Sequence, residues 1–265
     1  MRKKGFSLVE IAVVLVIMAV LLALVAQPLS SQIEARRREE TRRQLEVAKE
    51  ALIGYVISNG RLPCPATSTS NGIEAFAAPP ADNAANGACA QFNGFLPAVT
   101  LGLSPVDESG FAVDAWGGSP NRLRYAVSNR NTTSGTPSVC TGASQANVFT
   151  RTEGMRVATM PCLADTSGAM NLIQLCAVTP TGAPGAATNC TTLLSNKVPF
   201  LVFSSGNNAA GTPGTDESHN LDSDMYFVSH SPTPASSPNG EFDDIVAWGS
   251  LNTLFARMVQ AGKLP

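Results

Sequence analysis

The chain has 265 residues, which allows one or two domains. Its 18 lysine and arginine residues against 20 aspartate and glutamate residues give a formal net charge of −2, so nucleic acid is not predicted as a main partner. Charged residues make up only 14% of the chain, while glycine (22) and proline (18) are abundant, and this composition favours a loop-rich extracytoplasmic protein over a cytosolic enzyme.

A basic leader and a long apolar run open the chain. Arginine and lysine fill positions 2–4, and residues 8–26 then carry no polar side chain except that of Glu10. A run of about 20 apolar residues can cross a bilayer as a helix, and the basic leader places the N-terminus in the cytoplasm. A secretory signal peptide is the competing interpretation, but the run is longer than a usual signal-peptide core and lacks an obvious cleavage site at its end. We therefore predict a transmembrane helix over residues 6–29.

Glu10 is the one charge inside this apolar run. A charged side chain within a bilayer costs about 2.5–3.5 kcal/mol on insertion scales, so a carboxylate at this depth is a candidate functional group. Glu10 also lies near the start of the helix, where the helix dipole favours a carboxylate at the level of the lipid headgroups. Both interpretations stay open, because they can hold at different stages.

A second, amphipathic helical segment is predicted over residues 30–60. Pro28 precedes it, and we expect this proline to kink or locally melt the helix. The face opposite the apolar one carries charges spaced for i, i+3 and i, i+4 pairs, and Gly60 and Pro63 end the helix. The remaining residues, 61–265, are expected to form a periplasmic globular head. The apolar face has helical spacing and consists of Ile33, Leu45, Ala48, Leu52, Tyr55 and Val56.

All six cysteines follow residue 60, in the part predicted to lie outside the cytoplasm. Because disulfides persist in oxidising compartments, we predict at least two bridges, with free buried thiols as the alternative for the rest. The sequence does not choose among the connectivities. A zinc site is disfavoured, because no CxxC pair exists and only His219 and His230 are present. The disulfide candidates are Cys64, Cys89, Cys140, Cys162, Cys176 and Cys190.

The segment Gly5–Glu10 (Gly-Phe-Ser-Leu-Val-Glu), between the basic leader and the apolar run, resembles the processing site of type IV prepilins and type II secretion pseudopilins. The resemblance implies that residues 1–5 are a cytoplasmic leader peptide, removed after Gly5 by a prepilin peptidase, and that the new N-terminal Phe6 is methylated. It also implies that Glu10 pairs with the Phe6 amine of a neighbouring subunit during assembly. Such a pairing is physically consistent, because a carboxylate and an amine buried in lipid each need a partner.

This resemblance implies a pilin-like α+β fold: a long N-terminal helix, membrane-spanning in its first half, packed on an antiparallel β-sheet with large loops and a short C-terminal helix. The implied partners are other pilin or pseudopilin subunits, the prepilin peptidase, the inner-membrane assembly platform and inner-membrane lipid. The implied location is the bacterial inner membrane, with a cytoplasmic N-terminus and a periplasmic head, and then the filament. The head is longer than in a minimal pseudopilin, which suggests a minor subunit.

A second resemblance covers residues 114–125. The segment from Asp114 through Trp116 to Tyr125 is similar to the D-x-W-G-x-P turn and strand of major pseudopilins, with one residue inserted before Pro120 and a longer spacing to Tyr125. Its physical interpretation is a glycine-rich turn that leads into a short strand, with Trp116 and Tyr125 buried. This role is structural.

A third resemblance concerns calcium, the one candidate cofactor. Residues 239–248 are similar to the G-x-x-D-D-I-x-x-W segment that helps to form a calcium-binding loop in major pseudopilins. Residues 204–208 resemble the other half of that loop, with asparagine where an acidic residue is expected. The candidate ligands are Asn207, Asp243 and Asp244; the alternative is that the two aspartates cap a following helix. Calcium binds six to eight oxygens, and the insert between the halves offers Asp216, Glu217, Asp222 and Asp224.

The rest of the head alternates short apolar runs with turn-rich stretches. Short strands are predicted at Leu123–Val127, Met155–Ala158, Leu172–Val178, Pro199–Phe203 and Met225–Val228. Loops are predicted over 65–91, 128–147, 179–196, 205–223 and 229–241. The tail from Trp248 has the apolar spacing of a short helix that ends at Gly262.

The sequence carries no G-x-S-x-G, HExxH or P-loop motif, so no enzymatic activity is expected. We expect a subunit of a type IV pilus-like or type II secretion pseudopilus filament. The main alternative is a tip-located type IV minor pilin that acts as an adhesion or uptake module, and a remote alternative is a membrane-anchored periplasmic enzyme. The calcium-like loop and the tryptophan turn favour a pseudopilin, whereas the large cysteine-rich insertions favour a tip subunit.

Overall fold

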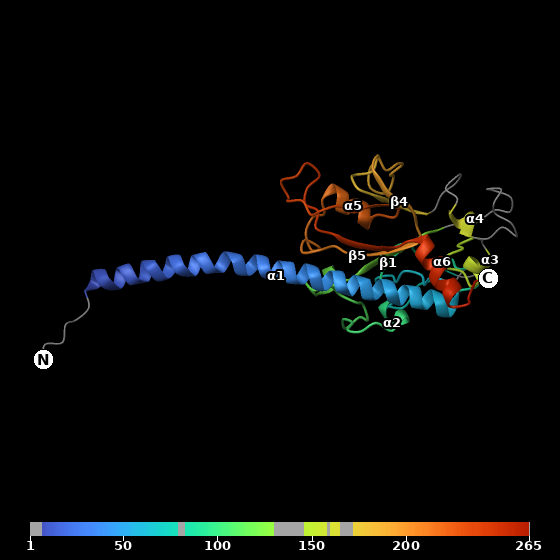
Figure 1. Cartoon of the computed structure of the whole chain (residues 1–265), viewed down its shortest axis with the longest axis horizontal. Coiled ribbons are helices and arrows are strands. Elements are labelled where there is room, and N and C mark those ends of the chain that lie inside the picture. The colour runs from blue at the N-terminus through green and yellow to red at the C-terminus, as the bar shows by residue number, and fades with distance from the viewer. Residues whose placement is uncertain (1–6, 79–82, 130–145, 158–159, 165–171, 265) are drawn as a thin grey trace.

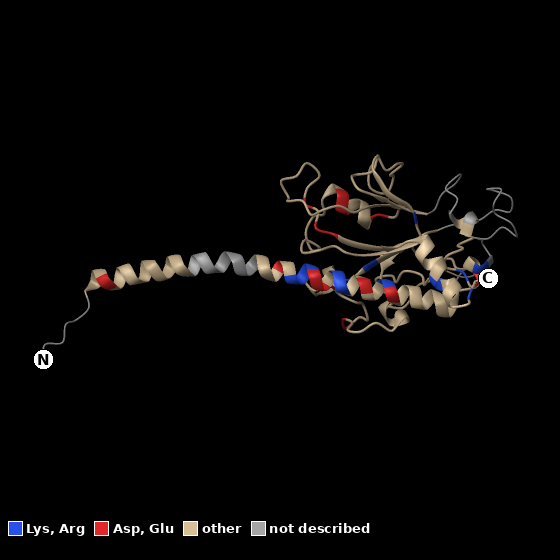
Figure 2. Ribbon diagram, viewed as in Figure 1, with Lys and Arg blue, Asp and Glu red and all other residues tan. Residues whose placement is uncertain are grey.

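A computed structural model describes residues 7–78, 83–129, 146–157, 160–164 and 172–264, with only the backbone described for residues 22–30, 157, 161 and 164. One long helix, α1, runs along the head with its C-terminal half and projects beyond it with its N-terminal half (Figure 1). Apart from Glu10 near its start, the charged residues of α1 lie in the middle of the helix and along the head (Figure 2).

Helix α1 spans Leu8–Asn59 without interruption. It ends at Gly60, as predicted, where a φ of 69° turns the chain and the Gly60 N–H donates to the Val56 carbonyl at 2.7 Å. Of the two outcomes expected at Pro28, local melting is wrong, because a proline removes one hydrogen bond, which a long helix with regular flanks tolerates. A kink there stays a prediction. The two predicted segments, 6–29 and 30–60, are therefore parts of one helix over the described residues.

The main sheet packs directly on α1. Its neighbouring strands are all antiparallel, in the order β1-β2-β5-β7. Residues alternate between its two faces: Tyr125 and Val202, which are register partners, join the α1 core, whereas Ala126 and Leu201 join a second core. Its strands are β1 (Asn93–Phe95), β2 (Arg124–Val127), β5 (Phe200–Ser204) and β7 (Ile245–Gly249).

The main core lies between this sheet, the C-terminal half of α1 and the last helix, α6 (Leu251–Gln260). Four residues of the predicted apolar face of α1 belong to it, at positions 45, 48, 52 and 56, which confirms the helical spacing at residues 45–56. Ile33, by contrast, is exposed. The fully or almost fully buried members include Leu45, Leu52, Val56, Tyr125, Val127, Phe200, Val202, Leu254 and Met258.

A second, smaller sheet covers the face of the main sheet that points away from α1. Its order is β4-β3-β6, with β3 antiparallel to β4 and parallel to β6. A second core of side chains such as Ile173, Phe203 and Phe227 fills the space between the two sheets. The expected α+β fold is confirmed, and this layer adds a parallel pair to it. The strands are β3 (Ile173–Cys176), β4 (Leu193–Val198) and β6 (Tyr226–Val228).

Several local predictions are wrong. The predicted strand at Met155–Ala158 is helical up to Val157, and Ala158 lies outside the described residues. The predicted loops at 179–196 and 205–223 contain the start of β4 and all of helix α5. The short helices and the 3₁₀ turn are α2 (Ala98–Leu101), η1 (Ser119–Asn121), α3 (Gly154–Val157), α4 (Met160–Ala164) and α5 (Thr215–Leu221).

The C-terminal helix begins later than expected. Trp248 belongs to β7, and α6 starts after Ser250, whose hydroxyl accepts the Thr253 N–H at 3.1 Å. The predicted helix cap at residues 243–244 is wrong, because the β-branched residues that follow pair with β5 as a strand. This correction leaves the two aspartates without a capping role.

Disulfides join segments that flank the sheets, as predicted. Cys64 bonds Cys89, which ties the chain after α1 to the approach to β1, and Cys176 bonds Cys190 between β3 and β4. Cys162 is also disulfide-bonded, and Cys140 lies outside the described residues. Because each bridge closes a loop, it lowers the conformational entropy of the unfolded chain.

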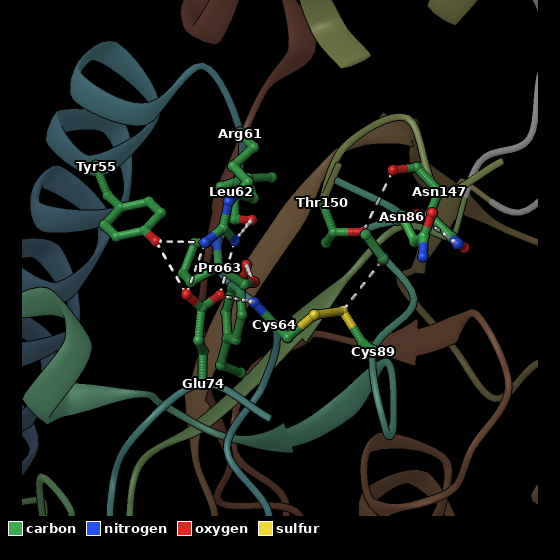
Figure 3. Close-up of a disulfide and its surroundings, with 12 residues drawn as sticks. Tyr55, Arg61, Leu62, Pro63, Cys64, Glu74, Asn86, Cys89, Asn147 and Thr150 are labelled. Carbon is green, nitrogen blue, oxygen red and sulfur yellow. Dashed lines mark hydrogen bonds and ion pairs between the residues drawn. A yellow bond between two sulfur atoms is a disulfide. The ribbon is translucent and has the colours of Figure 1, made fainter. Parts of the chain in front are cut away.

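A buried ion pair lies beside the first disulfide (Figure 3). The Arg61 guanidinium donates to both carboxylate oxygens of Glu74 at 2.7 Å, and the Tyr55 hydroxyl donates to Glu74 at 3.2 Å. Glu74 also accepts the Cys64 N–H at 3.2 Å. Burial and the nearby Glu74 charge raise the pKa of Tyr55 to about 12. This network fixes the chain reversal that follows α1.

We expect Glu74→Gln to lower the free energy of unfolding by about 3 kcal/mol or more, because it leaves the buried Arg61 charge without a counter-charge. The matched control is Glu153→Gln, which removes a pair of similar length (2.8 Å to Arg156) whose side chains are 49% and 54% exposed, against 12% and 8% for Glu74 and Arg61. The control should cost less than about 1 kcal/mol. Thermal unfolding of the full chain in detergent, followed by near-ultraviolet circular dichroism, measures both; equal losses would contradict a structural role for the buried pair.

Candidate functional site

The helix start carries a capping box built on Glu10. Ser7 is the N-cap, and its hydroxyl accepts the Val9 N–H at 3.3 Å. The Glu10 carboxylate accepts the Ser7 N–H at 2.9 Å, so each side chain satisfies a backbone donor that the helix leaves free. Gly5 and Phe6, the predicted processing residues, lie outside the described residues. The helix-start interpretation of Glu10 therefore has a physical basis, and the assembly interpretation stays a prediction.

The N-terminal part of α1 exposes an apolar surface. Every large apolar side chain from Leu8 to Leu21 is at least 51% exposed, because the head does not reach this part of the helix. Among the residues that the structure describes, no helix combines the length and the apolar character needed to cross a membrane. Residues 22–30 are described by their backbone alone, and the transmembrane segment expected over residues 6–29 stays a prediction.

A cluster of three buried carboxylates lies at the edge of the main sheet. Glu217 comes from α5, and Asp243 and Asp244 come from the residues just before β7. Each offers an oxygen atom within 4.8 Å of the other two, and the three residues are only 2%, 2% and 6% exposed. Three carboxylates at this depth are costly unless protons or a cation offset their charge.

The hydrogen bonds of this acidic cluster are unequal. Glu217 is saturated: it accepts the Asn208 amide at 3.0 Å, the Gly214 N–H at 3.0 Å and the Asp243 N–H at 2.9 Å. Asp244 accepts the Asn220 amide at 2.7 Å through Oδ2. The Oδ1 atoms of Asp243 and Asp244 have no hydrogen-bond partner among the described residues. Two buried oxygens are thus available to a cation.

The electrostatics of the cluster follow from this burial. Burial raises the pKa of Asp243 to about 6, and the neighbouring Glu217 charge adds to the rise, whereas the hydrogen bond from Asn207 opposes it. Burial also raises the pKa of Asp244 well above its usual range. Burial thus shifts the pKa of both aspartates in the direction that a bound cation would oppose.

The 204–208 loop, predicted as the first half of a calcium site, does close on the cluster. Gly206 lies so near Asp243 that a Cβ atom on it would be 2.1 Å from Asp243 Oδ1, and its φ of +64° also favours glycine. Asn207 donates its backbone N–H to Asp243 Oδ2 at 2.8 Å, but its side chain is exposed. The structure therefore brings Asp243 and Asp244 together with Glu217, and it does not place the Asn207 side chain among them.

The tryptophan turn is bonded to the same loop. Asp114 is buried and accepts the Ser204 hydroxyl at 2.5 Å and the Asn121 amide at 3.2 Å, and Asn121 also donates to the Gly206 carbonyl at 2.6 Å. Burial raises the pKa of Asp114. The tryptophan turn and the 204–208 loop, which both resemble pseudopilin segments, thus form one polar network.

The turn also contacts α1. The Trp116 indole N–H donates to Glu34 at 3.2 Å, and the Ala115 N–H donates to the Thr41 hydroxyl at 3.2 Å. Both side chains were predicted to be buried. Tyr125 is fully buried, whereas Trp116 is only half-buried against the helix. A continuous set of contacts therefore runs from α1 through the turn and the 204–208 loop to the acidic cluster.

Comparison with known families identifies the start of the chain. Residues 1–26 match the family described as the prokaryotic N-terminal methylation motif. This motif marks the prepilin-type pilins and pseudopilins, so the resemblance seen at the cleavage segment is confirmed. No curated protein and no solved structure matches the chain.

The contact between Gly206 and Asp243 predicts an unusually costly substitution at Gly206. We expect Gly206→Ala to lower the free energy of unfolding clearly more than Gly102→Ala, because alanine would displace the pinned Asp243 carboxylate. Gly102 is the matched control: its φ of +68° is nearly the same, but nothing lies within 4 Å of its Cβ position. The control should cost about 1–2 kcal/mol from backbone strain alone. Thermal unfolding measures the free energy of unfolding of both variants. Equal losses would contradict the prediction and would show that the 204–208 loop can shift away from Asp243.

Proposed function

We propose that this chain is a subunit of a type IV pilus-like or type II secretion pseudopilus filament, made as a prepilin, cleaved after Gly5 and assembled through its N-terminal helix. One observation carries the proposal: the methylation motif at residues 1–26 begins a helix whose apolar N-terminal part is left uncovered by its own head. Exposed apolar surface costs about 25 cal/mol per Å² in water, so this part belongs in lipid or among other helices.

Lipid would surround the N-terminal part of α1 in the precursor, and other helices would surround it in the filament. The basic leader favours a cytoplasmic N-terminus, and the disulfides of the head favour an oxidising compartment. We therefore place the precursor in the inner membrane with its head in the periplasm. Extraction into a filament then replaces the lipid around α1 with the corresponding helices of other subunits, and the prepilin peptidase and the assembly platform act before this step.

Glu10 can serve both the helix start and assembly. A carboxylate has two oxygens, each able to accept more than one hydrogen bond. Glu10 can keep the hydrogen bond that it accepts from the Ser7 N–H in the isolated chain. It can also pair with the Phe6 amine of a neighbouring subunit. The pairing neutralises two charges in an apolar bundle and fixes the register between helices.

The outer layer of the head favours a binding role within this proposal. In a filament whose axis is lined by α1, the sheet β4-β3-β6 and helix α5 lie on the side of the main sheet away from that helix. Their loops, one closed by Cys176–Cys190, would face the surroundings. This arrangement suits a tip-located minor pilin for adhesion or uptake. Loss of exoprotein release on deletion would instead favour a secretion pseudopilus.

Catalysis is not part of this proposal. Pilins are generally non-enzymatic structural subunits, and the motif at residues 1–26 marks that family. The remote alternative of a membrane-anchored periplasmic enzyme would require substrate turnover by the purified chain.

We further propose calcium as a structural ion held by Asp243 and Asp244, next to the hydrogen-bonded carboxylate of Glu217. The donor set consists of oxygens, as calcium requires, and the two unpartnered Oδ1 atoms are suited to a cation. The ion would supply positive charge that holds both aspartates ionised. Through Gly206 and Asn121 it would also stabilise the tryptophan turn against α1.

Substitution at Glu10 tests assembly separately from helix capping. Glu10→Gln keeps an acceptor for the Ser7 N–H but removes the charge, whereas Glu10→Ala removes both. We expect both variants to be cleaved after Gly5 and methylated at Phe6, as read by mass spectrometry, and to be absent from sheared filament fractions. Normal incorporation of Glu10→Gln would refute the pairing of Glu10 with the amine, and an intact Met1 in the membrane-bound wild type would refute processing.

Calcium should raise the midpoint of thermal unfolding of the full chain, because a ligand bound only by the folded state stabilises that state, and the more so as the ligand concentration exceeds the dissociation constant. Asp244→Asn should abolish most of this increase, since it removes a buried carboxylate with an unpartnered oxygen. Glu108→Gln, at an exposed acidic position, is the control and should retain it. The same increase in Asp244→Asn and in the wild type would exclude this cluster as the calcium site.

A further inference from the structure

A second cluster of metal-ligating side chains lies at the other end of α5. His219 is in the last turn of this helix, Asp222 follows it directly, and Asp224 precedes β6. Each offers a ligand atom within 4.8 Å of the other two. The cluster shares no residue with the acidic cluster at Glu217, and it contains a nitrogen ligand, which that cluster lacks.

His219 is the unusual member of this group. Its side chain is completely buried, yet neither ring nitrogen has a hydrogen-bond partner among the described residues. Nδ1 points toward the aspartates and lies 3.6 Å from Asp222 Oδ2, which is beyond hydrogen-bonding range. Buried polar groups are nearly always hydrogen-bonded, and an exception indicates a missing ligand, ion or water.

The two carboxylates are held in place by backbone groups. Asp222 accepts the Gly185 N–H at 2.6 Å and the Asp224 N–H at 2.8 Å. Asp224 accepts the Ala187 N–H at 2.9 Å and the Tyr226 N–H at 2.9 Å. Each carboxylate oxygen thus has one donor and keeps a lone pair. Hydrogen bonds of this kind orient metal ligands before the ion binds.

The surrounding chain is rigid on both sides of the cluster. Asn93 of β1 donates to the carbonyls of Asn220 and Asp222 at 3.0 and 2.6 Å, which anchors the end of α5. On the other side, the chain that supplies the Gly185 and Ala187 donors is closed by the Cys176–Cys190 disulfide. Asp222 and Asp224 are only partly buried, so an ion can reach the cluster from solvent.

From this geometry we propose that His219, Asp222 and Asp224 bind a divalent transition-metal ion of the zinc class, with water completing the coordination. An imidazole with two carboxylates suits zinc and its neighbours, whereas calcium takes oxygen ligands. Ligands at about 2.0–2.2 Å from one ion lie up to about 4.4 Å apart, so the observed spacing needs only a small contraction. The small number of histidines disfavours zinc from the sequence, but this site needs only one.

The ion would have a structural role that is independent of filament assembly. It would join the end of α5, the start of β6 and the segment near Gly185 into one unit of the outer layer. A protonated His219 that forms an ion pair with the aspartates, without any metal, is the competing explanation of the same geometry. Metal binding separates the two explanations directly.

The test uses the metal-stripped full chain in detergent, with calcium present in excess to occupy any oxygen-only site. Zinc is titrated by calorimetry, and cobalt is used as a spectroscopic probe of a nitrogen-containing site. We expect one zinc ion per chain, a rise in the unfolding midpoint, and visible cobalt absorption bands. His219→Gln and Asp224→Asn should each weaken zinc binding at least about tenfold, and His219→Gln should lose the cobalt bands.

His230→Gln is the matched control, because His230 is the other histidine and contacts Asp216 instead. It should bind zinc and cobalt as the wild type does. Absence of zinc binding by the wild type, or wild-type affinity in His219→Gln, would overturn the proposal in favour of the metal-free ion pair. If His219→Gln does not fold, Asp224→Asn decides in the same way, since its residue is less buried. Neither result bears on the Glu10 experiment.

Discussion

The packing of the C-terminal half of α1 against the main sheet is the interaction on which the rest of the head depends. Leu45, Leu52 and Val56 are completely buried between β5, β7 and α6. A buried leucine in such a position contributes roughly 1.5–3 kcal/mol relative to an exposed one. The same helix leaves its N-terminal apolar residues from Leu8 to Leu21 uncovered. One continuous helix thus stabilises the head and offers the apolar surface on which the proposed assembly depends.

The regular parts of this arrangement could be predicted from the sequence. The spacing of apolar residues 45–56 and the glycine at position 60 define the helix and its end, and apolar runs locate β2, β3, β5 and β6. The strand predicted at Met155–Ala158 is wrong because so short a segment, with three apolar residues among four, fits a helix as well as a strand. Helix α5 was not predicted because it lacks an apolar face. It is stabilised by the Glu217 cap and by the burial of His219 and Asn220, and that burial depends on tertiary contacts.

The residues of the candidate site, too, could be predicted only in part from the sequence. Motif spacing identified Asp243 and Asp244, because they stand next to a strand that the family resemblance marks. No local signal distinguished Glu217 from the other acidic residues of the insert, since its inward orientation depends on contacts with Asn208 and Asp243. Two residues further along α5, His219 faces a different cluster. A short helix thus separates two proposed ion sites, and Asn220, the residue after His219, donates to Asp244 of the first site.

In the proposed membrane-anchored state, the contact between Trp116 and Glu34 would set how far the head stands from the lipid. Among the described side chains of α1, Glu34 is the first that the head partly buries. The helix backbone over residues 8–33 therefore lies beyond the head (Figure 1), over about 39 Å at 1.5 Å per residue. This length is close to the full thickness of a bilayer with its headgroups, about 40–45 Å. In the proposed anchored state the head would rest on the membrane surface without a tether. Its tilt against the membrane would then be restricted before the subunit meets the growing filament.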